Sequence, residues 1–466
     1  MKGFVVLVYD PAGQGERQQA YDPRLGKSII GGSTEQHFLN GAAAILLGQS
    51  FARYPIWDGM RALDYLASRK EVDKERIGCT GCSGGGTLTT YLSALDPRIK
   101  VAAPACSMNS FRTLFSGPVG DSEQSIPGFL AAGLDQADYV ELFAPKPWLI
   151  SSTEGDYFTP AGARQVYEEA RNWYESQKAQ DRIKWIVGPG PHGMPPVVRE
   201  AIYEWMIRWL MNGKVDSRES KVELVPDHML RASARGQVPG RDLYEVIRET
   251  ALEPTSNVIP FIKKLLAENP AFGATIEAPP PGSMRRPAII VVDTPEAEVT
   301  RLRAEGNVVI VVKPARAEGR LYSGNWLANT RAWLIGHNLP AMHASEIRRA
   351  VDLALARPDV EPTQISARAD GVAGVWLLLA AVTDDRITRI ELNRTPYSYR
   401  AALDNPVHRN LHDAVIPGFS LRWDLQDLVR AIQPRRVIWT DPTDWLDNVV
   451  PQPGPYRYTS SDASRN

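Results

Sequence analysis

Short apolar runs alternate with stretches of helical periodicity over the first 212 residues, and this alternation constrains the fold more than any other feature of the sequence. Strands separated by helices pair in parallel and are covered on both faces. The pattern therefore predicts an α/β fold with a doubly wound, mostly parallel sheet. The expected strands are residues 4–9, 76–80, 101–105, 148–152 and 184–187. The expected helices are residues 58–68, 87–95, 160–178 and 195–211.

The length of the chain predicts more than one domain. Its 466 residues exceed the roughly 250–300 residues at which a single hydrophobic core usually stops growing. After residue 212 the periodicity weakens, and proline, glycine and charged residues accumulate, most clearly at residues 278–282. We therefore expect a first unit at residues 1–212, a connecting region at 213–286 and a second unit at 287–466.

The second unit resembles a decayed copy of the first. One shift of 288 residues aligns charged as well as apolar positions. Two unrelated α/β units would share generic strand and helix patterns, but the charged matches favour duplication over that alternative. The matched pairs include Asp64 with Asp352, Ile77 with Ile365, Gly86 with Gly374, Asp96 with Asp384, and Arg98 with Arg386.

A G-x-S-x-G sequence, Gly81-Cys82-Ser83-Gly84-Gly85, lies between an expected strand and an expected helix. A serine on such a tight turn projects its hydroxyl at the carboxyl edge of the sheet, and glycines allow the neighbouring backbone to approach closely. The N–H groups at the start of the helix face a developing oxyanion. The motif also occurs by chance, and the alternative for Ser83 is a small residue in a tight turn.

Two further residues strengthen the assignment of Ser83 as a nucleophile. Asp156 follows the expected strand 148–152, and His192 follows the expected strand 184–187. The order Ser, Asp, His, each beyond the carboxyl end of a successive strand, is the order of α/β-hydrolase triads. His192 would accept the proton of Ser83 while Asp156 orients the imidazole.

Alternatives remain for the other two triad residues. Asp156 could instead be a helix N-cap, and Glu154 would then be the acid. His192 could instead be a histidine of a surface loop. His37 is the other histidine of the first unit. No strand is expected before His37, which favours His192 as the base.

The segment Cys79-Thr80-Gly81-Cys82 is a C-x-x-C sequence after a strand, which raises the hypothesis of a thioredoxin-like redox role. That role leaves the placement of Asp156 and His192 unexplained, and we expect Cys79 to pack in the strand. The glycines around Ser83 do not form G-x-G-x-x-G, so no dinucleotide site is expected. We expect no cofactor and no metal site. The three cysteines, which include Cys106, provide no disulfide framework.

The composition argues against two classes of partner. The formal net charge is -1, with 23% charged and 43% hydrophobic residues, so we expect no nucleic-acid partner. No run approaches the roughly 18 apolar residues that span a bilayer, and the first ten residues lack the features of a secretory signal. The sequence therefore predicts a soluble chain with no membrane partner.

Four segments of the sequence resemble acetyl xylan esterase-like α/β-hydrolases of bacteria, a group that lies near the glucuronoyl esterases. They are D-P-A-G-Q-G-E-R at residues 10–17, the glycine-rich residues 78–86, residues 138–147 and His192. The resemblance covers residues 1 to about 212 and implies an α/β-hydrolase fold. Combined with the repeat, it implies two tandem hydrolase-like units.

The resemblance also implies a function and a site. It implies a serine carboxylic-ester hydrolase that deacetylates xylan-like carbohydrate esters, with a triad of Ser83, Asp156 and His192 and an oxyanion donor at the N–H of Gly84. Members of the group are commonly exported, although the chain shows no export signal. The candidates for a substrate-site loop are Gln14, Gly15 and Glu16.

The sequence departs from the group at its start. Members carry several strands and a histidine-glycine loop before the segment that opens here, and that loop normally supplies the second oxyanion donor. The third strand of the group would lie between residues 4–9 and the strand leading to Ser83, so we expect a gap in the sheet. We interpret Met1 as an internal or misassigned start, or the chain as a fragment. We expect weak activity from the chain with this start, because the N-terminal strands are missing.

The second unit is expected to be a degenerate copy without catalytic activity. The residue 288 positions after Ser83 is Gly371, and no histidine follows His412. Asp444 follows an expected strand as a rough counterpart of Asp156. Two alternatives to the esterase stay open. One is a serine peptidase of the same fold, and the other is a catalytically impaired binding or scaffold protein.

Overall fold

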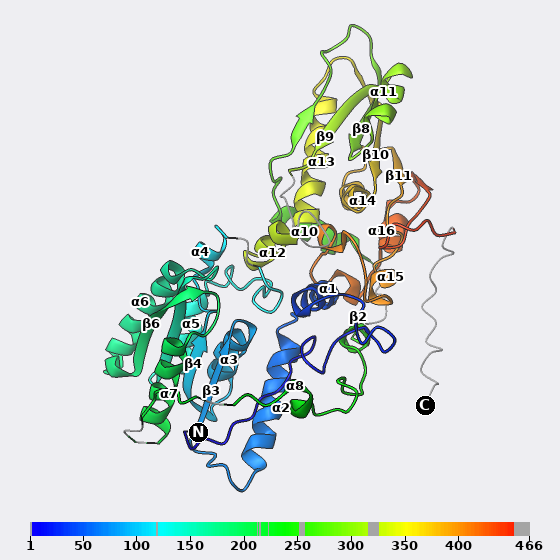
Figure 1. The fold of residues 1–466 in the computed structure, drawn as a ribbon. Helices are drawn as coiled ribbons and strands as arrows, with labels where there is room; N and C mark the ends of the chain where they lie inside the picture. The colour runs from blue at the N-terminus through cyan, green and yellow to red at the C-terminus, as the bar shows by residue number, and fades with distance from the viewer. Residues whose placement is uncertain are drawn as a thin grey trace. The chain divides into compact units, whose positions relative to one another are not determined.

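The structure, a computed structural model, describes residues 2–117, 120–211, 213, 216–221, 223–250, 257–315 and 326–451. The chain divides into two compact units (Figure 1). The first comprises Met1–His37 and Ser50–Gly240, and the second comprises Phe38–Gln49 and Arg241–Asn466. This division splits the expected connecting region after Gly240. The expected boundaries at residues 212 and 286 mark the extent of the proposed repeat and stay predictions.

The first unit is built on four parallel strands in the order β3-β4-β5-β6 (Figure 1). Successive strands are joined through helices, as parallel neighbours require. The four strands predicted between residues 76 and 187 are confirmed. They are β3 (Ile77–Cys82), β4 (Ile99–Ala105), β5 (Trp148–Gly155) and β6 (Ile183–Pro191). The main helices are α2 (Arg53–Ser68), α3 (Gly84–Leu95), α5 (Gln136–Phe143), α6 (Pro160–Ser176) and α7 (Pro196–Leu210).

Different helices cover the two faces of this sheet. Apolar residues of α2, α3, α5 and α6 form one buried cluster with one face. Residues of α7, such as Ile202, form a second cluster with the other face. Successive residues of β4 alternate between the clusters, with Ala102 in the first and Val101 and Ala103 in the second. Burial on both faces is the reason that this strand is apolar from Val101 to Ala105.

The other described elements of the first unit are short, apart from α1. The helix α1 (Ser33–Leu46) begins in the first unit, and its residues from Phe38 onward belong to the second. The periodicity of the sequence did not predict this helix. The short elements are an antiparallel pair, β1 (Tyr21–Asp22) and β2 (Lys27–Ser28), the helices α4 (Phe111–Leu114) and α8 (Asp227–Leu230), and the 3-10 turn Gln180–Arg182.

The second unit contains a six-stranded sheet in the order β12-β11-β10-β8-β9-β7. Its strands are parallel except β7, which is antiparallel to β9. The winding reverses between β8 and β10, the kind of position where ligands bind in open α/β sheets. The strands are β7 (Thr275–Glu277), β8 (Arg286–Val292), β9 (Val308–Lys313), β10 (Val360–Asp370), β11 (Arg389–Asn393) and β12 (Arg436–Thr440).

Helices cover both faces of this second sheet unequally. Residues of α10, α13, α14 and α16, with Ala42 and Ile45 of α1, pack in one large cluster. On the other face, Val299 and Leu302 of α11 pack against Ile289 and neighbouring strand residues. The helices are α9 (Leu243–Arg248), α10 (Ile259–Glu268), α11 (Glu296–Ala304), α12 (Trp326–Leu334), α13 (Leu339–Leu355), α14 (Ala373–Thr383), α15 (Arg400–Leu403) and α16 (Leu425–Ile432), with 3-10 turns at Leu411–Asp413 and Phe419–Leu421.

The predicted strand at residues 4–9 is wrong. The segment forms no strand, and Val6 and Val8 are 75% and 83% exposed. In the second unit, β9 follows β8 along the chain, and β8 lies between β9 and β10 in the sheet. No described strand of the first unit fills a place like that of β8 beside β3. Residues 4–9 therefore have no neighbouring strand to satisfy their backbone N–H and C=O groups.

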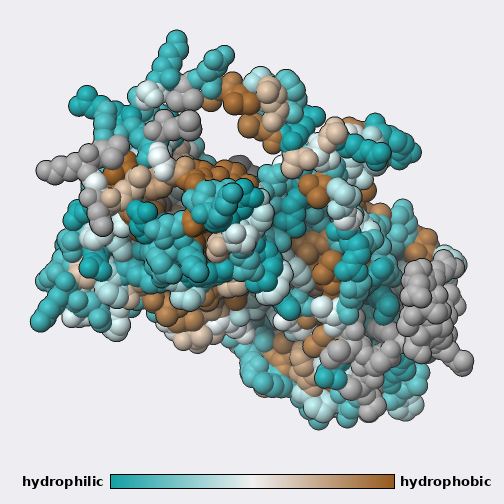
Figure 2. Space-filling model, turned by 90° about the horizontal axis from the view of Figure 1, so that it is seen from below, coloured by the Kyte–Doolittle hydropathy of each residue, from teal (hydrophilic) through white to brown (hydrophobic). Residues whose placement is uncertain are grey.

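Among the described helices, none combines the length and hydrophobicity needed to cross a bilayer. On the face drawn in Figure 2, hydrophobic residues form separate groups between hydrophilic ones.

Candidate active site

Ser83 occupies a strained turn between β3 and α3. Its backbone angles are φ 58° and ψ −122°, a conformation that residues with a Cβ rarely adopt. The chain can turn this sharply only because the flanking residues lack side chains. A Cβ on Gly81 would lie 2.5 Å from the carbonyl oxygen of Gly85, and one on Gly86 would lie 2.4 Å from Ser107 Oγ. This arrangement is typical of a nucleophilic serine at the carboxyl edge of a parallel sheet.

Asp156 and His192 meet at the same edge of the sheet. Asp156 directly follows β5, and His192 directly follows β6. The Nδ1 atom of His192 lies 2.8 Å from Oδ1 of Asp156, whose side chain is fully buried. The backbone N–H of Phe158 donates to the same carboxylate oxygen over 2.9 Å, and the hydroxyl of Thr153 donates to the other over 3.2 Å. The carboxylate is thereby fixed, and it holds the imidazole in one orientation. Glu154, the alternative acid, is exposed.

Tyr157 links the imidazole to the serine, and it was not identified from the sequence pattern. Its ring stacks on that of His192 with centroids 4.3 Å apart. Its hydroxyl shares a hydrogen bond with Ser83, and burial raises the pKa of the phenol, which keeps it neutral. Within the described residues, Ser83 makes no direct hydrogen bond to His192. Asp156 and His192 are thus in contact with each other, and Ser83 is joined to them through Tyr157.

Of the predicted substrate loop, Gln14 lies at the site, whereas Gly15 and Glu16 make structural contacts. Gly84 begins α3, and a Cβ at that position would lie 3.7 Å from the side-chain nitrogen of Gln14. The Gln14 amide is therefore beside the Ser83 turn. Gly15 has φ 51° and packs against the Asp10 carboxylate. The carboxylate of Glu16 accepts backbone N–H groups at residues 232 and 233, so it holds a loop together.

A buried group of charges contacts the start of this loop at Ala12. His37 Nδ1 lies 3.2 Å from Glu123 Oε2, and His37 Nε2 lies 3.0 Å from the carbonyl oxygen of Ala12. Burial opposes both charges, but their mutual attraction raises the pKa of His37 and lowers that of Glu123. Burial, followed by repulsion from Glu123, raises the pKa of Asp121 to about 7. His37 is thus engaged with Glu123, and the sequence did not predict this pairing.

The C-x-x-C segment does not form a dithiol pair. Cys79 and Cys82 lie on the same strand at odd spacing, so their side chains point to opposite faces. Cys79 packs with the cluster under α2, α5 and α6, whereas Cys82 packs with the cluster under α7. The expected packing of Cys79 in the strand is confirmed, and the redox hypothesis is not supported.

The equivalent region of the second unit lacks the same groups. Gly371 directly follows β10 with φ 62°, close to that of Ser83, but it carries no hydroxyl. The carboxylate of Asp444 accepts the backbone N–H groups of Leu446 and Asn448 over 2.7 and 3.0 Å, so it caps a turn.

Several contacts recur in both units at the same shift of 288 residues. Arg98 pairs with Asp64 and Asp96, each at 2.6 Å. The counterpart, Arg386, pairs with Asp352 and Asp384 at 2.8 and 2.7 Å. The strand registers also agree, because Thr80 faces Ala103 in β3 and β4 while Arg368 faces Glu391 in β10 and β11.

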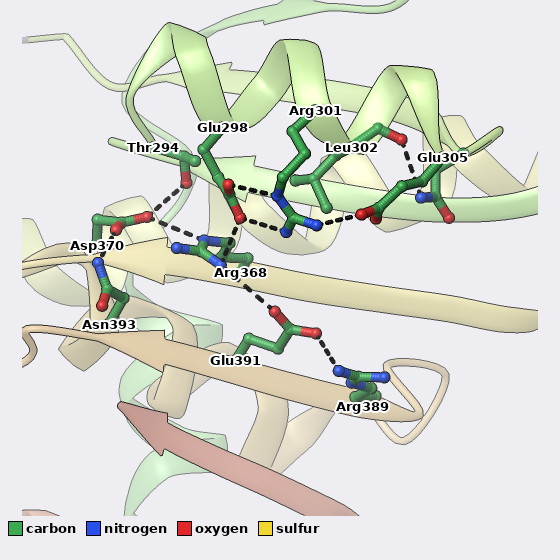
Figure 3. Close-up of polar contacts among 11 residues, drawn as sticks. Thr294, Glu298, Arg301, Leu302, Glu305, Arg368, Asp370, Arg389, Glu391 and Asn393 are labelled. Atoms are coloured by element: carbon green, nitrogen blue, oxygen red, sulfur yellow. Dashed lines mark hydrogen bonds and ion pairs between the residues drawn. The ribbon is translucent and has the colours of Figure 1, made fainter. Parts of the chain in front are cut away.

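The sheet face that α7 covers in the first unit is polar in the second. Val101, Ala103 and Ala105 pack against α7, and their counterparts are Arg389, Glu391 and Asn393. Figure 3 shows that these residues belong to a chain of alternating charges from α11 across β10 to β11. Arg368 lies at its centre, 2.8 Å from Glu298, 3.6 Å from Glu391 and 3.3 Å from Asp370. In the described part of the second unit, no helix follows β12.

Comparison with known proteins gives matches to esterases and a hydrolase. Residues 1–114 match the acetyl xylan esterase (AXE1) family. YtaP of Bacillus subtilis (strain 168), which is named as a hydrolase, is 28% identical over 212 residues, 45% of this chain and 66% of that protein. The chain therefore spans just under two thirds of the length of this relative.

Solved structures overlap with the chain only in part. A carbohydrate esterase family 15 glucuronoyl esterase from Caldicellulosiruptor kristjansonii is 20% identical, with a TM-score of 0.31 over 38% of this chain and 56% of that one. The glucuronoyl esterase domain from Hypocrea jecorina is 14% identical, with a TM-score of 0.32 over 40% and 59%. The parallel sheet with helices on both faces confirms the predicted α/β fold. In sequence, residues 1–114 are similar to the acetyl xylan esterase family of hydrolases.

Proposed function

We propose that the first unit is a serine carboxylic-ester hydrolase with Ser83 as nucleophile, His192 as general base and Asp156 as the residue that orients it. The observation that carries the proposal is the 2.8 Å contact between His192 and the fully buried Asp156, at the sheet edge where Ser83 is held with positive φ. A carboxylate that fixes the imidazole in one tautomer, at the same sheet edge as a half-buried serine on a strained turn, provides the groups that acyl transfer requires.

The reaction follows from these groups. The Ser83 oxygen attacks the acyl carbon as His192 Nε2 accepts its proton, and the negative charge moves to the former carbonyl oxygen. The ester C–O bond then breaks, and the alcohol leaves with the proton from His192. Water attacks the acyl-enzyme by the same route, which releases the acid and regenerates the Ser83 hydroxyl. For the first step, the hydroxyl of Ser83 exchanges its hydrogen bond with Tyr157 for one with His192.

Two donors are available for the oxyanion. The N–H of Gly84, the first residue of α3, is one, because the helix N-terminus favours negative charge there. The side-chain amide of Gln14 is the other, since it lies beside Gly84. Removing one such donor costs about 10²–10³ in kcat. We therefore expect Gln14→Ala to lower kcat for an acetyl ester without loss of folding, as read from circular dichroism.

The substrate is proposed to be an acetyl ester of a xylan-like carbohydrate. This substrate class comes from the match of residues 1–114 to the acetyl xylan esterase family. A polymeric ester of this kind lies outside the cell, so the proposal includes export of the protein. The second unit is proposed to be a duplicated hydrolase-like domain without catalytic activity, supported by the recurrent Arg98 and Arg386 ion pairs and by glycine at position 371.

A fluorophosphonate probe tests the nucleophile directly. We expect one adduct per chain on the peptide that contains Ser83, none in Ser83→Ala, and unchanged labelling in Ser68→Ala, a matched control on the last turn of α2. Release of acetate from acetylated xylan and of 4-nitrophenol from its acetate should follow the same pattern. Cleavage of a dipeptide amide but not of the esters would replace the proposal with a peptidase. Absence of any adduct on folded protein would leave the scaffold alternative.

A further inference from the structure

A third side chain with metal-binding chemistry lies beside the Asp156 and His192 pair. The Sγ atom of Cys106, a carboxylate oxygen of Asp156 and a ring nitrogen of His192 all lie within 4.8 Å of one another. Cys106 directly follows β4, so the three residues come from the ends of three neighbouring strands. In the described part of the chain, this is the one group of three such ligand atoms that lies so close together.

The chemistry of this group fits zinc. A thiolate, a carboxylate and an imidazole are its usual ligands, at about 2.3 Å for sulfur and about 2.0–2.2 Å for nitrogen and oxygen. Tetrahedral binding at these lengths separates the ligand atoms by about 3.3–3.6 Å. Separations of up to 4.8 Å must therefore close by at most about 1.2–1.5 Å to reach these values. The site also leaves one tetrahedral position for water, as zinc sites with three protein ligands do.

The sulfur of Cys106 is buried against the loop that carries His192. Cys106 is 1% exposed, and its thiol donates to the carbonyl oxygen of Gly193 over 3.0 Å, in the same loop as His192. The thiol of Cys82 shares a hydrogen bond with that of Cys106, so a second sulfur lies next to the group. The His192 side chain is 20% exposed, which gives the solvent access that an entering ion needs.

We propose that Cys106, Asp156 and His192 form a binding site for Zn²⁺, and that occupancy of this site inhibits the hydrolase. Binding displaces the thiol proton of Cys106 to solvent, and the zinc bonds form to its sulfur, to the Asp156 carboxylate and to Nδ1 of His192. The imidazole then carries its remaining proton on Nε2. That nitrogen has no free lone pair to accept the proton of Ser83. The sequence predicted no metal site, because it did not bring residue 106 next to the other two.

The inhibition part of this inference depends on the proposed hydrolase activity, whereas the binding part does not. Binding is therefore measured with Co²⁺ on the full chain under reducing conditions. We expect a thiolate-to-cobalt charge-transfer band in the near ultraviolet that Zn²⁺ abolishes by displacement. Competition with a chromogenic chelator gives the zinc affinity of each variant.

Two serine variants separate the site from general thiol binding. Cys106→Ser should lose the charge-transfer band and bind zinc at least tenfold more weakly. Cys79→Ser should behave like the parent chain, because Cys79 packs on the opposite face of β3. A band that persists in Cys106→Ser, or equal zinc affinity of the parent and Cys106→Ser, would falsify the site.

Ester hydrolysis then tests the consequence for catalysis. With each variant compared to its own metal-free rate, we expect the zinc concentration for half inhibition to rise at least tenfold in Cys106→Ser and to stay unchanged in Cys79→Ser. Equal sensitivity of both variants would overturn the inhibition. If no variant hydrolyses esters while the cobalt band behaves as expected, the hydrolase proposal fails and the metal site stands.

Discussion

The ring of Tyr157 stacks on the imidazole of His192 with centroids 4.3 Å apart, and its hydroxyl shares a hydrogen bond with Ser83. Such ring pairs contribute about 0.5–1.5 kcal/mol beyond the area that they bury. The stack therefore supplements the Asp156 hydrogen bond in fixing the imidazole.

Substitution of Tyr157 separates its ring from its hydroxyl. We expect Tyr157→Phe to keep at least half of kcat/KM for 4-nitrophenyl acetate, since the stack is retained. Tyr157→Ala should lower kcat by about two- to tenfold, the equivalent of the stacking energy. A steady-state comparison of the two variants checks this. Equal losses in both would mean that the hydroxyl, and not the ring, carries the effect.

Asp156→Asn should lower kcat far more than Glu154→Gln. An amide in this place holds the imidazole in the wrong tautomer, and losses of about 10⁴ in kcat accompany such changes in triads. Glu154→Gln is the matched control, because Glu154 is exposed two residues away. The measurement is kcat for an acetyl ester in both variants. A large loss in Glu154→Gln with little loss in Asp156→Asn would move the acid to the other residue.

The sequence pattern was sufficient to predict the strands that precede Ser83, Asp156 and His192, because each strand is marked by a run of neighbouring apolar residues. It was not sufficient for Tyr157, whose contacts arise only when the ends of β5 and β6 meet. It also missed the pairing of His37 with Glu123, which joins residues 86 positions apart. Residues 4–9 show the reverse error. Their β-branched sequence favours a strand, but strand formation needs a neighbour, which local sequence does not encode.

Asp121 should make the first unit less stable as the pH rises toward neutrality. Its pKa is raised to about 7, so between about pH 4 and 7 the folded chain keeps a proton that the unfolded chain has lost. Stability therefore falls over this interval. In Asp121→Asn the penalty is absent, so its melting temperature should match the parent near pH 4 and exceed it at pH 8. Thermal unfolding across this range, with the exposed Glu175→Gln as control, measures the difference. A constant offset between variant and parent at every pH would contradict this assignment.

Arg368 should be a stabilising residue of the second unit. It faces three carboxylates, those of Glu298, Asp370 and Glu391, and its side chain is 16% exposed. Its replacement by methionine would leave these acids facing one another without a counter-charge, at a cost of about 1–3 kcal/mol. Arg303→Met, which removes an exposed pair with Glu296, should cost less than about 1 kcal/mol. Urea unfolding compares the two, and equal costs would show that the charge network contributes no more than a surface pair.

Gly371 offers a test of whether the second unit lacks only its nucleophile. Its φ of 62° is close to the 58° of Ser83, so Gly371→Ser places a hydroxyl on a comparable turn. The strain of a Cβ at this φ costs about 1–2 kcal/mol. We expect no activity and no fluorophosphonate adduct at residue 371 in the combined Ser83→Ala and Gly371→Ser chain, because no histidine follows His412 to act as base. Mass mapping of the probe decides the question. An adduct at 371 would mean that another base serves the second unit and that its loss of catalysis lies in the serine alone.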